Sequence, residues 1–373
     1  MFELLFFLTS VFASTCICVA VSWPFISWWL AAKEQQSSTY DAMNVERCTV
    51  IIAARNEADR IAKTLEGIKS LRSLDVFVVV VSDGSTDDTV ARARDSGVDA
   101  VVDLPSSVGK TAAMRRGMEM RRRGDYVVFM DATTHVDESS LMALLQSFSD
   151  PAIGAASGLV IYEYSEHAVS EGFRAYQQAV VWSRMTDSHW FTVSSVSGAL
   201  CAIRPEIWSD TVPDDVTPDL AIPFWAARVG LRTRLVSDAM CFDTSRRSAG
   251  SVFRARLRMA LQAYSFMTYV WTSRQGIPRR YWCVLLGHKV ARWLSPVALA
   301  MMLLAMIFVW PVSALALLLT VSSPVFLAQL PGGARLFGPS YFFVTVSAAY
   351  VVGLMYFLAG KRAAVWEPNA QRR

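Results

Sequence analysis

Apolar positions are concentrated at the two ends of the chain, and the pattern between them is that of a soluble domain. Residues 1–32 carry one charged side chain, that of Glu3, and residues 293–360 carry one, that of Arg335. A helix of about 20 predominantly apolar residues crosses the hydrocarbon core of a bilayer. The pattern therefore predicts a transmembrane anchor at residues 1–32 and further spans within residues 293–360.

The first apolar segment is expected to be an anchor and not a cleaved signal peptide. No basic residue precedes it, and its apolar stretch is longer than a signal peptide needs. Trp23, Trp28 and Trp29 near its end are typical of the aromatic belt at a membrane interface. Lys33 follows them, and because lysine and arginine favour the cytoplasmic side, the next domain is expected to be cytoplasmic.

Residues 45–245 alternate short apolar runs with segments of helical periodicity. Runs at residues 49–53, 76–82 and 126–130 predict buried strands, and residues 56–71 have apolar side chains at helical spacing. Nearly continuous apolar strands that alternate with helices are typical of parallel sheets covered on both faces. We therefore expect an α/β domain with a Rossmann-like, mostly parallel sheet.

A mixture of basic and apolar residues follows this domain at residues 246–292. It predicts amphipathic helices that lie in the membrane interface, with ordinary surface helices as the alternative. The tail, residues 361–373, is basic, which favours a cytoplasmic end. An outside start and an inside end require an odd number of crossings, three being the simplest. Two spans within residues 294–330 would instead give four crossings and an outside tail.

Charge and cysteine content narrow the classes of function. The formal net charge is +4 and no basic motif for nucleic acid is present, so nucleic acid is not an expected partner. The six cysteines have neither the paired spacing of a disulfide framework nor the spacing of a zinc site. Reduced thiols are therefore expected, as in the cytosol.

Three aspartates are the main candidates for chemistry. Asp83 follows the apolar run at residues 76–82, and Asp131 follows the run at residues 126–130. Ligands of an open parallel sheet bind beyond the carboxyl ends of its strands, so these two carboxylates are expected to face one cleft. Asp219 comes much later in the chain and would bring a third carboxylate from a separate segment.

The order of these motifs resembles that of family 2 glycosyltransferases with the GT-A fold. The segments that carry the resemblance are residues 49–57, 81–89, 130–134, 197–204 and 213–223. The segment His288-Lys-Val-Ala-Arg-Trp293 is similar to the Gln-x-x-Arg-Trp element of membrane-embedded synthases of cellulose, hyaluronan and poly-N-acetylglucosamine. The resemblance implies a GT-A catalytic domain at residues 45–245.

The resemblance also implies a nucleotide-sugar site at the strand ends. Asp83 would accept a hydrogen bond from the uracil imide, although such an aspartate also begins helices, and Arg55 and Glu57 would hold the nucleoside. Lys110 would contact the nucleotide, or else be an exposed lysine at a helix start. Arg292 would bind the leaving diphosphate through two hydrogen bonds, with a snorkelling arginine at the start of a span as the alternative.

Asp131 stands where the family's Asp-x-Asp motif begins, which implies contact with the ribose, the metal or both. Thr133 replaces the second acidic residue, so one carboxylate remains to hold the Mg²⁺ or Mn²⁺ that would neutralise the diphosphate. His135 and Asp137 are candidate substitutes, with helix capping or solvent exposure as the alternatives. A divalent cation is expected, held more loosely than by two aspartates.

Asp219 is the expected general base, which would take the proton of the acceptor hydroxyl during an inverting transfer. The family has an acidic pair at this point. Pro218 replaces the first residue of the pair, and Asp214 and Asp215 remain competing candidates.

Gly198 and Trp293 are the expected acceptor contacts. Gly198 permits close approach of the backbone, and Trp293 would pack beside the acceptor sugar. Lys289 stands where the family has glutamine, which leaves the other acceptor contacts open.

Together these features predict a membrane-bound inverting glycosyltransferase of a plasma membrane, such as a bacterial inner membrane, with a cytoplasmic catalytic domain. It would move a hexosyl or N-acetylhexosaminyl group from a nucleotide sugar, with a UDP-sugar expected, to a glycan or lipid-linked acceptor. One alternative is a single-addition enzyme that glycosylates a lipid, as ceramide glucosyltransferase does. The other is a non-catalytic membrane scaffold.

Overall fold

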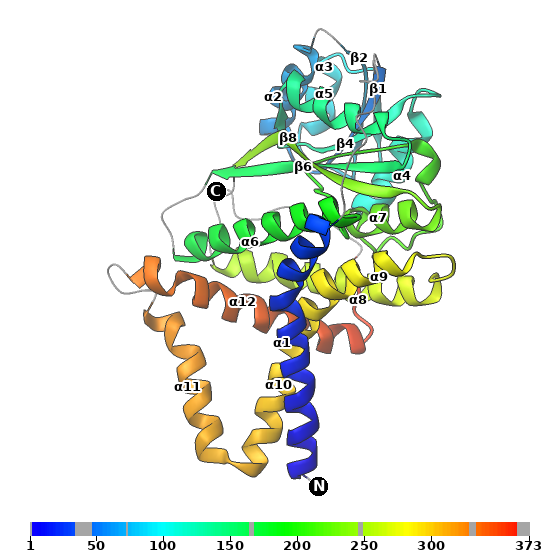
Figure 1. Ribbon diagram of the computed structural model, residues 1–373. Coiled ribbons are helices and arrows are strands. Elements are labelled where there is room, and N and C mark those ends of the chain that lie inside the picture. The colour runs from blue at the N-terminus through cyan, green and yellow to red at the C-terminus, as the bar shows by residue number, and fades with distance from the viewer. Residues whose placement is uncertain are drawn as a thin grey trace.

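The structure is a computed structural model in which an α/β domain sits on one end of a set of long helices (Figure 1). The α/β class and the flanking apolar helices agree with the sequence prediction. Residues 364–373 of the expected basic tail lie outside the described part of the chain. The described residues are 2–33, 47–71, 74–163, 168–244, 249–327 and 333–363.

Within the described ranges, the α/β domain has one eight-stranded sheet in the order β3-β2-β1-β4-β7-β6-β8-β5. Strands β3, β2, β1 and β4 run parallel, β7 is antiparallel to β4 and β6, and β6 and β8 are parallel. The mostly parallel sheet is confirmed. The strands are β1 (Arg47–Ala54), β2 (Asp75–Ser82), β3 (Ala100–Asp103), β4 (Tyr126–Asp131), β5 (His135–Val136), β6 (Ile153–Glu163), β7 (Leu200–Ile203) and β8 (Arg232–Thr244).

Helices cover both faces of this sheet, as the apolar strands predict. Every residue of β1 after Arg47 is buried. Ile51 packs in one apolar cluster with α4 and α7, whereas Val50 and Ile52 pack in a second cluster with α2 and α5. The helices of the domain are α2 (Ala58–Lys69), α3 (Thr89–Asp95), α4 (Lys110–Met120), α5 (Glu138–Gln146), η1 (Ser147–Ser149), α6 (Ala168–Trp190), η2 (Pro205–Ile207) and α7 (Pro218–Arg228).

The strand β8 has no counterpart among the apolar runs that predict strands. It pairs with β6 through two register shifts, and such irregularities interrupt the alternation of apolar and polar residues by which strands are recognised. The other edge strand, β5, has two residues and is too short to leave a pattern.

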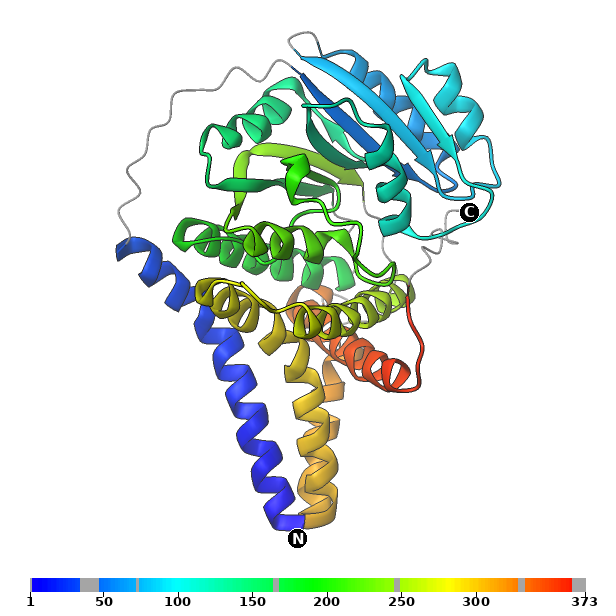
Figure 2. The same cartoon turned by 90° about the vertical axis from the view of Figure 1, so that its right-hand side faces the viewer.

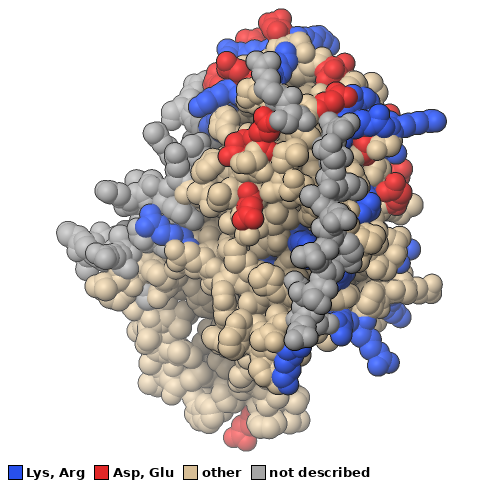
Figure 3. Space-filling view, turned by 45° about the horizontal axis from the view of Figure 1, so that its top comes forward, with Lys and Arg blue, Asp and Glu red and all other residues tan. Residues whose placement is uncertain are grey.

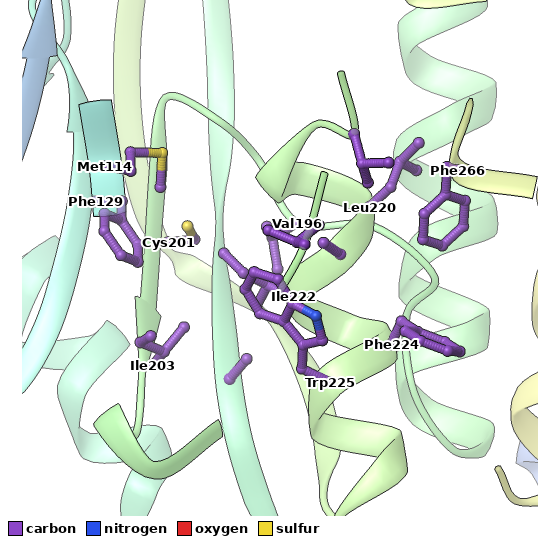
Figure 4. Close-up of a cluster of buried hydrophobic side chains, with 14 of the residues drawn as sticks. Met114, Phe129, Val196, Cys201, Ile203, Leu220, Ile222, Phe224, Trp225 and Phe266 are labelled. Carbon is purple, nitrogen blue, oxygen red and sulfur yellow. The ribbon is translucent and has the colours of Figure 1, made fainter. Parts of the chain in front are cut away.

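The helix that carries Asp219 is held by apolar packing on both sides. Figure 4 shows Leu220 and Phe224 of α7 beside Phe266 of α8 (Ala249–Thr272), with Phe129 of β4 in the same cluster. The ring centroids of Phe224 and Phe266 are 6.2 Å apart. Because α7 is packed between the sheet and α8, its first turn has a defined position relative to both.

Long apolar helices make up the rest of the described chain. Among the described residues, three helical stretches are long and apolar enough to cross a membrane, namely Phe2–Lys33, Arg279–Val309 and Leu336–Leu358. The elements are α1 (Phe2–Lys33), α9 (Arg279–Val284), the π-helical turn η3 (Leu285–Val290), α10 (Ala291–Val309), α11 (Pro311–Leu327) and α12 (Gly333–Leu358).

Helices α1 and α10 run antiparallel to each other. At one end Phe2 stacks on Phe308 with ring centroids 4.9 Å apart. At the other end the indole of Trp23 packs so close to Gly287 that an added Cβ would lie 2.2 Å from it. The chain turns at Trp310, which precedes a proline and leaves the helical conformation, and α11 then returns toward the α/β domain (Figure 1).

Helix α12 lies beneath the α/β domain and crosswise to α10 (Figures 1 and 2). A Cβ added to Gly172 of α6 would lie 2.4 Å from the Gly338 carbonyl oxygen, and one added to Gly353 would lie 2.8 Å from the Ala260 Cβ of α8. Both halves of α12 therefore pack closely against helices of the α/β domain.

The chain returns to the α/β domain after α12. Arg362 Nε lies 3.6 Å from Asp215 Oδ2, and Gln262 Nε2 donates to the Ala363 carbonyl oxygen at 3.5 Å. The end of the described chain is thus on the same side of the long helices as the sheet. Figure 3 shows charged side chains gathered over the α/β domain, whereas the surface of the long helices is mostly uncharged.

Candidate active site

The loops that follow β1 and β2 are joined at the carboxyl edge of the sheet. Asn56 has a positive φ of 53°, which asparagine adopts more readily than most residues, and its Oδ1 accepts the Thr86 N–H at 2.8 Å. The Glu57 N–H donates to Thr89 Oγ1 at 2.9 Å. The structure therefore places Arg55 and Glu57 beside the turn that follows β2.

Asp83 lies at the start of this turn and is 1% exposed. Its carboxylate accepts hydrogen bonds from Ser107 Oγ at 2.7 Å, from the Val108 N–H at 2.6 Å and from the Gly109 N–H at 3.1 Å. Arg55 Nη1 donates to the same Ser107 Oγ at 2.9 Å. Asp83 thus fixes the loop before α4, and this loop sets the position of the first residue of that helix.

That first residue, Lys110, joins two strand ends. Its Nζ lies 2.7 Å from Asp131 Oδ1 and donates to the Gly198 carbonyl oxygen at 3.2 Å. Burial alone would lower the pKa of Lys110, but the carboxylates of Asp131 and Asp219 outweigh burial and raise it. The ammonium is therefore a fixed positive charge at the point where the two carboxylates approach each other.

Asp219 lies in the first turn of α7, where Pro218 is suited to begin a helix. A Cβ added to Gly198 would lie 2.8 Å from Asp219 Oδ2 and 2.9 Å from Lys110 Nζ, so these groups converge where only glycine fits. Burial raises the pKa of Asp219, Lys110 opposes this rise, and Asp131 adds to it. A half-buried carboxylate with a raised pKa is suited to accept a proton.

The two competing aspartates are engaged elsewhere. Asp214 Oδ1 pairs with Arg115 Nη1 at 3.0 Å, and Asp215 Oδ2 accepts a hydrogen bond from Ser265 Oγ at 2.7 Å. Because neither contacts Lys110 in the described chain, the geometry favours Asp219 as the base.

Arg292 and Trp293 lie apart from this group: within the described residues, no hydrogen bond joins either to Lys110 or to the aspartates around it. Arg292 Nε donates to the His288 carbonyl oxygen at 2.7 Å, and its guanidinium carbon lies 6.0 Å from the Tyr176 ring centroid. Trp293 is 6% exposed and packs in the apolar core. Their roles at the diphosphate and at the acceptor stay predictions.

Asp131 is where a divalent cation would be held. Its side chain is 40% exposed, and one of its oxygens pairs with Lys110. His135 lies in β5, and Asp137 caps α5 by accepting the Ser140 N–H at 2.7 Å. The described ranges contain no group of three metal-ligating side chains. Because Mg²⁺ is often held by one carboxylate together with substrate phosphates and water, Asp131 fits a cation that the donor helps to bind.

Sequence reasoning missed Arg184, which supports the loop before Gly198. Arg184 Nη2 donates to Ser157 Oγ at 2.6 Å and to the Ser195 carbonyl oxygen at 3.3 Å. The same Ser157 Oγ accepts the Ser197 N–H at 2.8 Å. The only signal in the sequence is an arginine within an amphipathic helix, and such a residue usually faces water.

Comparisons with known proteins agree with this arrangement. The chain is 27% identical over 230 residues to a poly-beta-1,6-N-acetyl-D-glucosamine synthase of Staphylococcus aureus, and the match covers 58% of this chain and 54% of the relative. The corresponding synthase of Staphylococcus epidermidis is 24% identical over 230 residues, with the same coverage. The chain thus spans about half the length of the curated relatives it matches.

A solved structure shares the fold. The mannosyltransferase PcManGT from Pyrobaculum calidifontis, in complex with GDP-Man and Mn²⁺, superposes with a TM-score of 0.72 at 21% sequence identity. The superposition covers 95% of this chain and 100% of the mannosyltransferase. The α/β domain is therefore a GT-A domain, as expected from the sequence.

One further match, to a family model that covers more than half of the chain, identifies the family. Residues 46–261 fit the family described as glycosyltransferase like family 2, and they include the sheet, Lys110, Asp131 and Asp219. With the GT-A fold and the synthase relatives, this match establishes that the chain belongs to glycosyltransferase family 2 and is a glycosyltransferase.

Proposed function

We propose that this enzyme transfers a sugar, with inversion, from a UDP-sugar to an acceptor hydroxyl at the cytoplasmic face of a plasma membrane. The observation that carries the proposal is the convergence of Lys110, Asp131 and Asp219 around Gly198 at the carboxyl edge of the sheet. The similarity to poly-N-acetylglucosamine synthases supports an N-acetylhexosamine as the transferred sugar.

At the donor end, the buried carboxylate of Asp83 and the loop it holds would contain the nucleoside, with Arg55 and Glu57 at the rim. Lys110 would stabilise the negative charge that develops on the leaving diphosphate, because its ammonium is already in place before the reaction. Its contact with Asp131 orients the ammonium toward the strand ends.

At the acceptor end, Asp219 would act as the general base. The acceptor oxygen attacks the anomeric carbon, the bond from that carbon to the diphosphate breaks, and the hydroxyl proton passes to Asp219. Gly198 leaves room for this approach because it has no side chain between Asp219 and Lys110. Arg292, which the sequence places at the diphosphate, lies beside Tyr176, and we assign it to the acceptor side together with Trp293.

Asp131 would hold a divalent cation, Mg²⁺ or Mn²⁺, with the donor diphosphate. The mannosyltransferase that shares the fold was solved with Mn²⁺. Such a cation would neutralise the charge of the leaving diphosphate when it is bound. Lys110 supplies part of the same positive charge from the chain itself.

For the membrane topology, we propose three crossings, made by α1, α10 and α11. Length and composition alone would also allow α12 to cross. Its packing against Gly172 of α6 and Ala260 of α8 supports a position in the interface instead, where apolar helices lie parallel to the bilayer. The pair of Arg362 with Asp215 then supports a cytoplasmic position for the end of the described chain, on the same side as the catalytic domain.

The proposal is tested by incubating the purified full chain in nanodiscs with UDP-N-acetylglucosamine and measuring UDP release and labelled product. Release that depends on Asp219 and yields a glycosylated product supports the proposal. Long products indicate a polymer synthase, and products with one added sugar indicate the single-addition alternative. No turnover of any UDP-sugar would contradict the proposed donor.

A further inference from the structure

Four cationic side chains lie beside Asp219 or beside Tyr176 of α6. Arg184 comes from α6, Lys289 from the turn η3, Arg292 from α10 and Arg256 from α8. We call these four residues the cationic cluster.

The cluster is organised around Tyr176 of α6. Tyr176 and Arg184 are eight residues apart, so they lie on the same face of that helix. The guanidinium carbon of Arg256 lies 4.9 Å from the Tyr176 ring centroid, and that of Arg292 lies 6.0 Å from it. Lys289 is close enough to act electrostatically on Asp219, as Arg184 also does. Lys289 and Arg184 therefore border the proposed base, whereas Arg256 and Arg292 lie beside Tyr176.

These charges are poorly neutralised. Within the described chain, none of the four cations has a carboxylate oxygen within 4.0 Å. Asp187, which like Asp219 acts electrostatically on Arg184 and Lys289, accepts the Trp23 Nε1–H at 2.7 Å and contacts His288. Burial raises the pKa of Asp187 to about 7, so its negative charge is incomplete at neutral pH.

The degree of burial makes this imbalance significant. Arg256 is 5% exposed among aromatic rings, and the Nε atoms of Arg184 and Arg256 are buried with no hydrogen-bond partner among the described residues. Lys289 makes no hydrogen bond in the described chain, although it remains half-buried and accessible. Like charges held together away from water are unfavourable unless an anion joins them. The cluster is therefore suited to an anion that the described residues do not supply.

The position of the cluster indicates where such an anion comes from. Arg256 lies against Phe173 of α6 and Phe342 of α12, with its guanidinium carbon 5.9 Å and 5.3 Å from the two ring centroids. Helix α12 is the apolar helix that lies crosswise to α10, beneath the α/β domain. Arg292 lies in the first turn of α10, within the stretch Arg279–Val309 that is long and apolar enough to cross a membrane. A lipid headgroup at this depth would meet the cluster, and its acyl chains would lie along apolar helices.

We propose that the cationic cluster binds the phosphate of a phospholipid whose headgroup carries a free hydroxyl, and that this hydroxyl is the sugar acceptor. The inference rests on the proposed function and names its acceptor class. The headgroup oxygen would form the new bond to the anomeric carbon, its proton would pass to Asp219, and UDP would leave with the electron pair of the broken bond. A base beside the cluster favours a hydroxyl, because a phosphate oxygen is already ionised and needs no base.

Lys289 is the residue that most clearly distinguishes this site from a site for an uncharged acceptor. It occupies the position at which the synthases that the sequence resembles have an uncharged glutamine. The substitution places an amine that can be protonated beside the base, and an uncharged glycan chain has no group to match its charge. Lys289→Gln is therefore the most informative variant, and Lys289→Arg keeps the charge.

Binding is measured by calorimetry on the purified full chain in a zwitterionic detergent. Dioctanoyl phosphatidylglycerol is the probe, with dioctanoyl phosphatidylcholine and glycerol 3-phosphate as comparisons. We expect phosphatidylglycerol to bind at least about tenfold more tightly than either, because only it combines a free hydroxyl, a net charge and acyl chains. Equal binding of phosphatidylcholine, or tighter binding of glycerol 3-phosphate, would overturn the lipid assignment.

The variants locate the site. Lys289→Gln and Arg292→Gln should each weaken phosphatidylglycerol binding roughly tenfold or more, and Lys289→Arg should retain it. Arg274→Gln, which removes an exposed arginine at the end of α8, is the matched control and should bind as the unmodified chain does. Equal weakening in this control would show nonspecific membrane charge. Loss of UDP affinity with unchanged lipid binding in these variants would show that the cluster binds the donor diphosphate and not a lipid phosphate. Either result contradicts the proposal.

Turnover separates this inference from the proposed function. Sugar transfer to another acceptor, with no binding of phosphatidylglycerol, would refute the lipid acceptor and leave the glycosyltransferase reaction standing. Binding of phosphatidylglycerol by a chain that binds no nucleotide sugar would support the lipid site and refute the proposed donor.

Discussion

Lys110 Nζ lies 2.7 Å from Asp131 Oδ1, and this contact joins the helix α4 to the end of the strand β4. Lys110 also approaches Asp219 closely enough for both carboxylates to raise its pKa. One ammonium therefore connects the residue proposed at the donor with the residue proposed as the base. The chemistry of each carboxylate depends on it.

Replacing Lys110 with methionine should change the pH dependence of turnover. Lys110 holds the pKa of Asp219 down against the effect of burial, so its removal should raise that pKa further. Asp219 is an effective base only when ionised, so activity falls as the pH drops through its pKa. The acid limb of kcat/KM should therefore move to higher pH in Lys110→Met. Arg116→Met on the exposed face of α4 is the control, and an identical shift in both variants would contradict the coupling.

Adding one methyl group at Gly198 should impair catalysis without unfolding the chain. The new Cβ would lie 2.8 Å from Asp219 Oδ2 and 2.9 Å from Lys110 Nζ, so both side chains must move. We expect Gly198→Ala to lower kcat by about 10- to 100-fold, as small displacements of catalytic groups do. Gly67→Ala, which meets nothing within 4 Å in α2, should leave kcat unchanged and raise the melting temperature slightly. Unaltered turnover in Gly198→Ala would show that the three groups do not act together.

The sequence is informative wherever a residue's role is local. Apolar runs locate β1, β2 and β4, and aspartates that follow such runs mark the carboxyl edge of a parallel sheet. For Asp137, the sequence offers helix capping as the alternative to metal binding, and the structure shows that Asp137 caps α5. The strand β8 is not predictable in the same way, because its register shifts interrupt the pattern.

Roles that depend on distant contacts cannot be read from the pattern. Length and composition make α12 a candidate membrane span, and its contacts with α6 and α8 cannot be expected from the sequence. Arg184 and Arg256 look like solvent-facing arginines of amphipathic helices, yet Arg256 is 5% exposed. Burial of a charge depends on which helices pack together, and that information is not local in the sequence.

The divalent cation should bind weakly and should bind more tightly when the missing carboxylate is restored. Asp131 alone, with the donor diphosphate, gives few anionic ligands. We expect activity to fall in excess EDTA and to return with Mg²⁺ or Mn²⁺. Thr133→Asp should lower the metal concentration needed for half-maximal activity, whereas Thr134→Ser, beside it, should not change it. Full activity in EDTA would show that Lys110 and other cations neutralise the diphosphate without a metal.

The proposed topology predicts where the chain can be tagged. A reporter fused after residue 373 should be cytoplasmic, because the chain returns to the catalytic domain at Arg362. A reporter inserted at Trp310, between α10 and α11, should be outside. Helix α10 leads away from the catalytic domain and ends beside Phe2, the start of α1. Protease protection in spheroplasts and inverted vesicles checks both. An outside C-terminus would show that α12 crosses the membrane.

The measurement that tests the central claim most directly is the turnover of Asp219→Asn. Asparagine keeps the size of the side chain and removes the proton acceptor, so UDP affinity should be unchanged while kcat falls by about 10²- to 10⁴-fold. Asp215→Asn, whose carboxylate accepts a hydrogen bond from Ser265, is the control and should retain most of its turnover. Normal turnover in Asp219→Asn together with an inactive Asp215→Asn would contradict the assignment of the base.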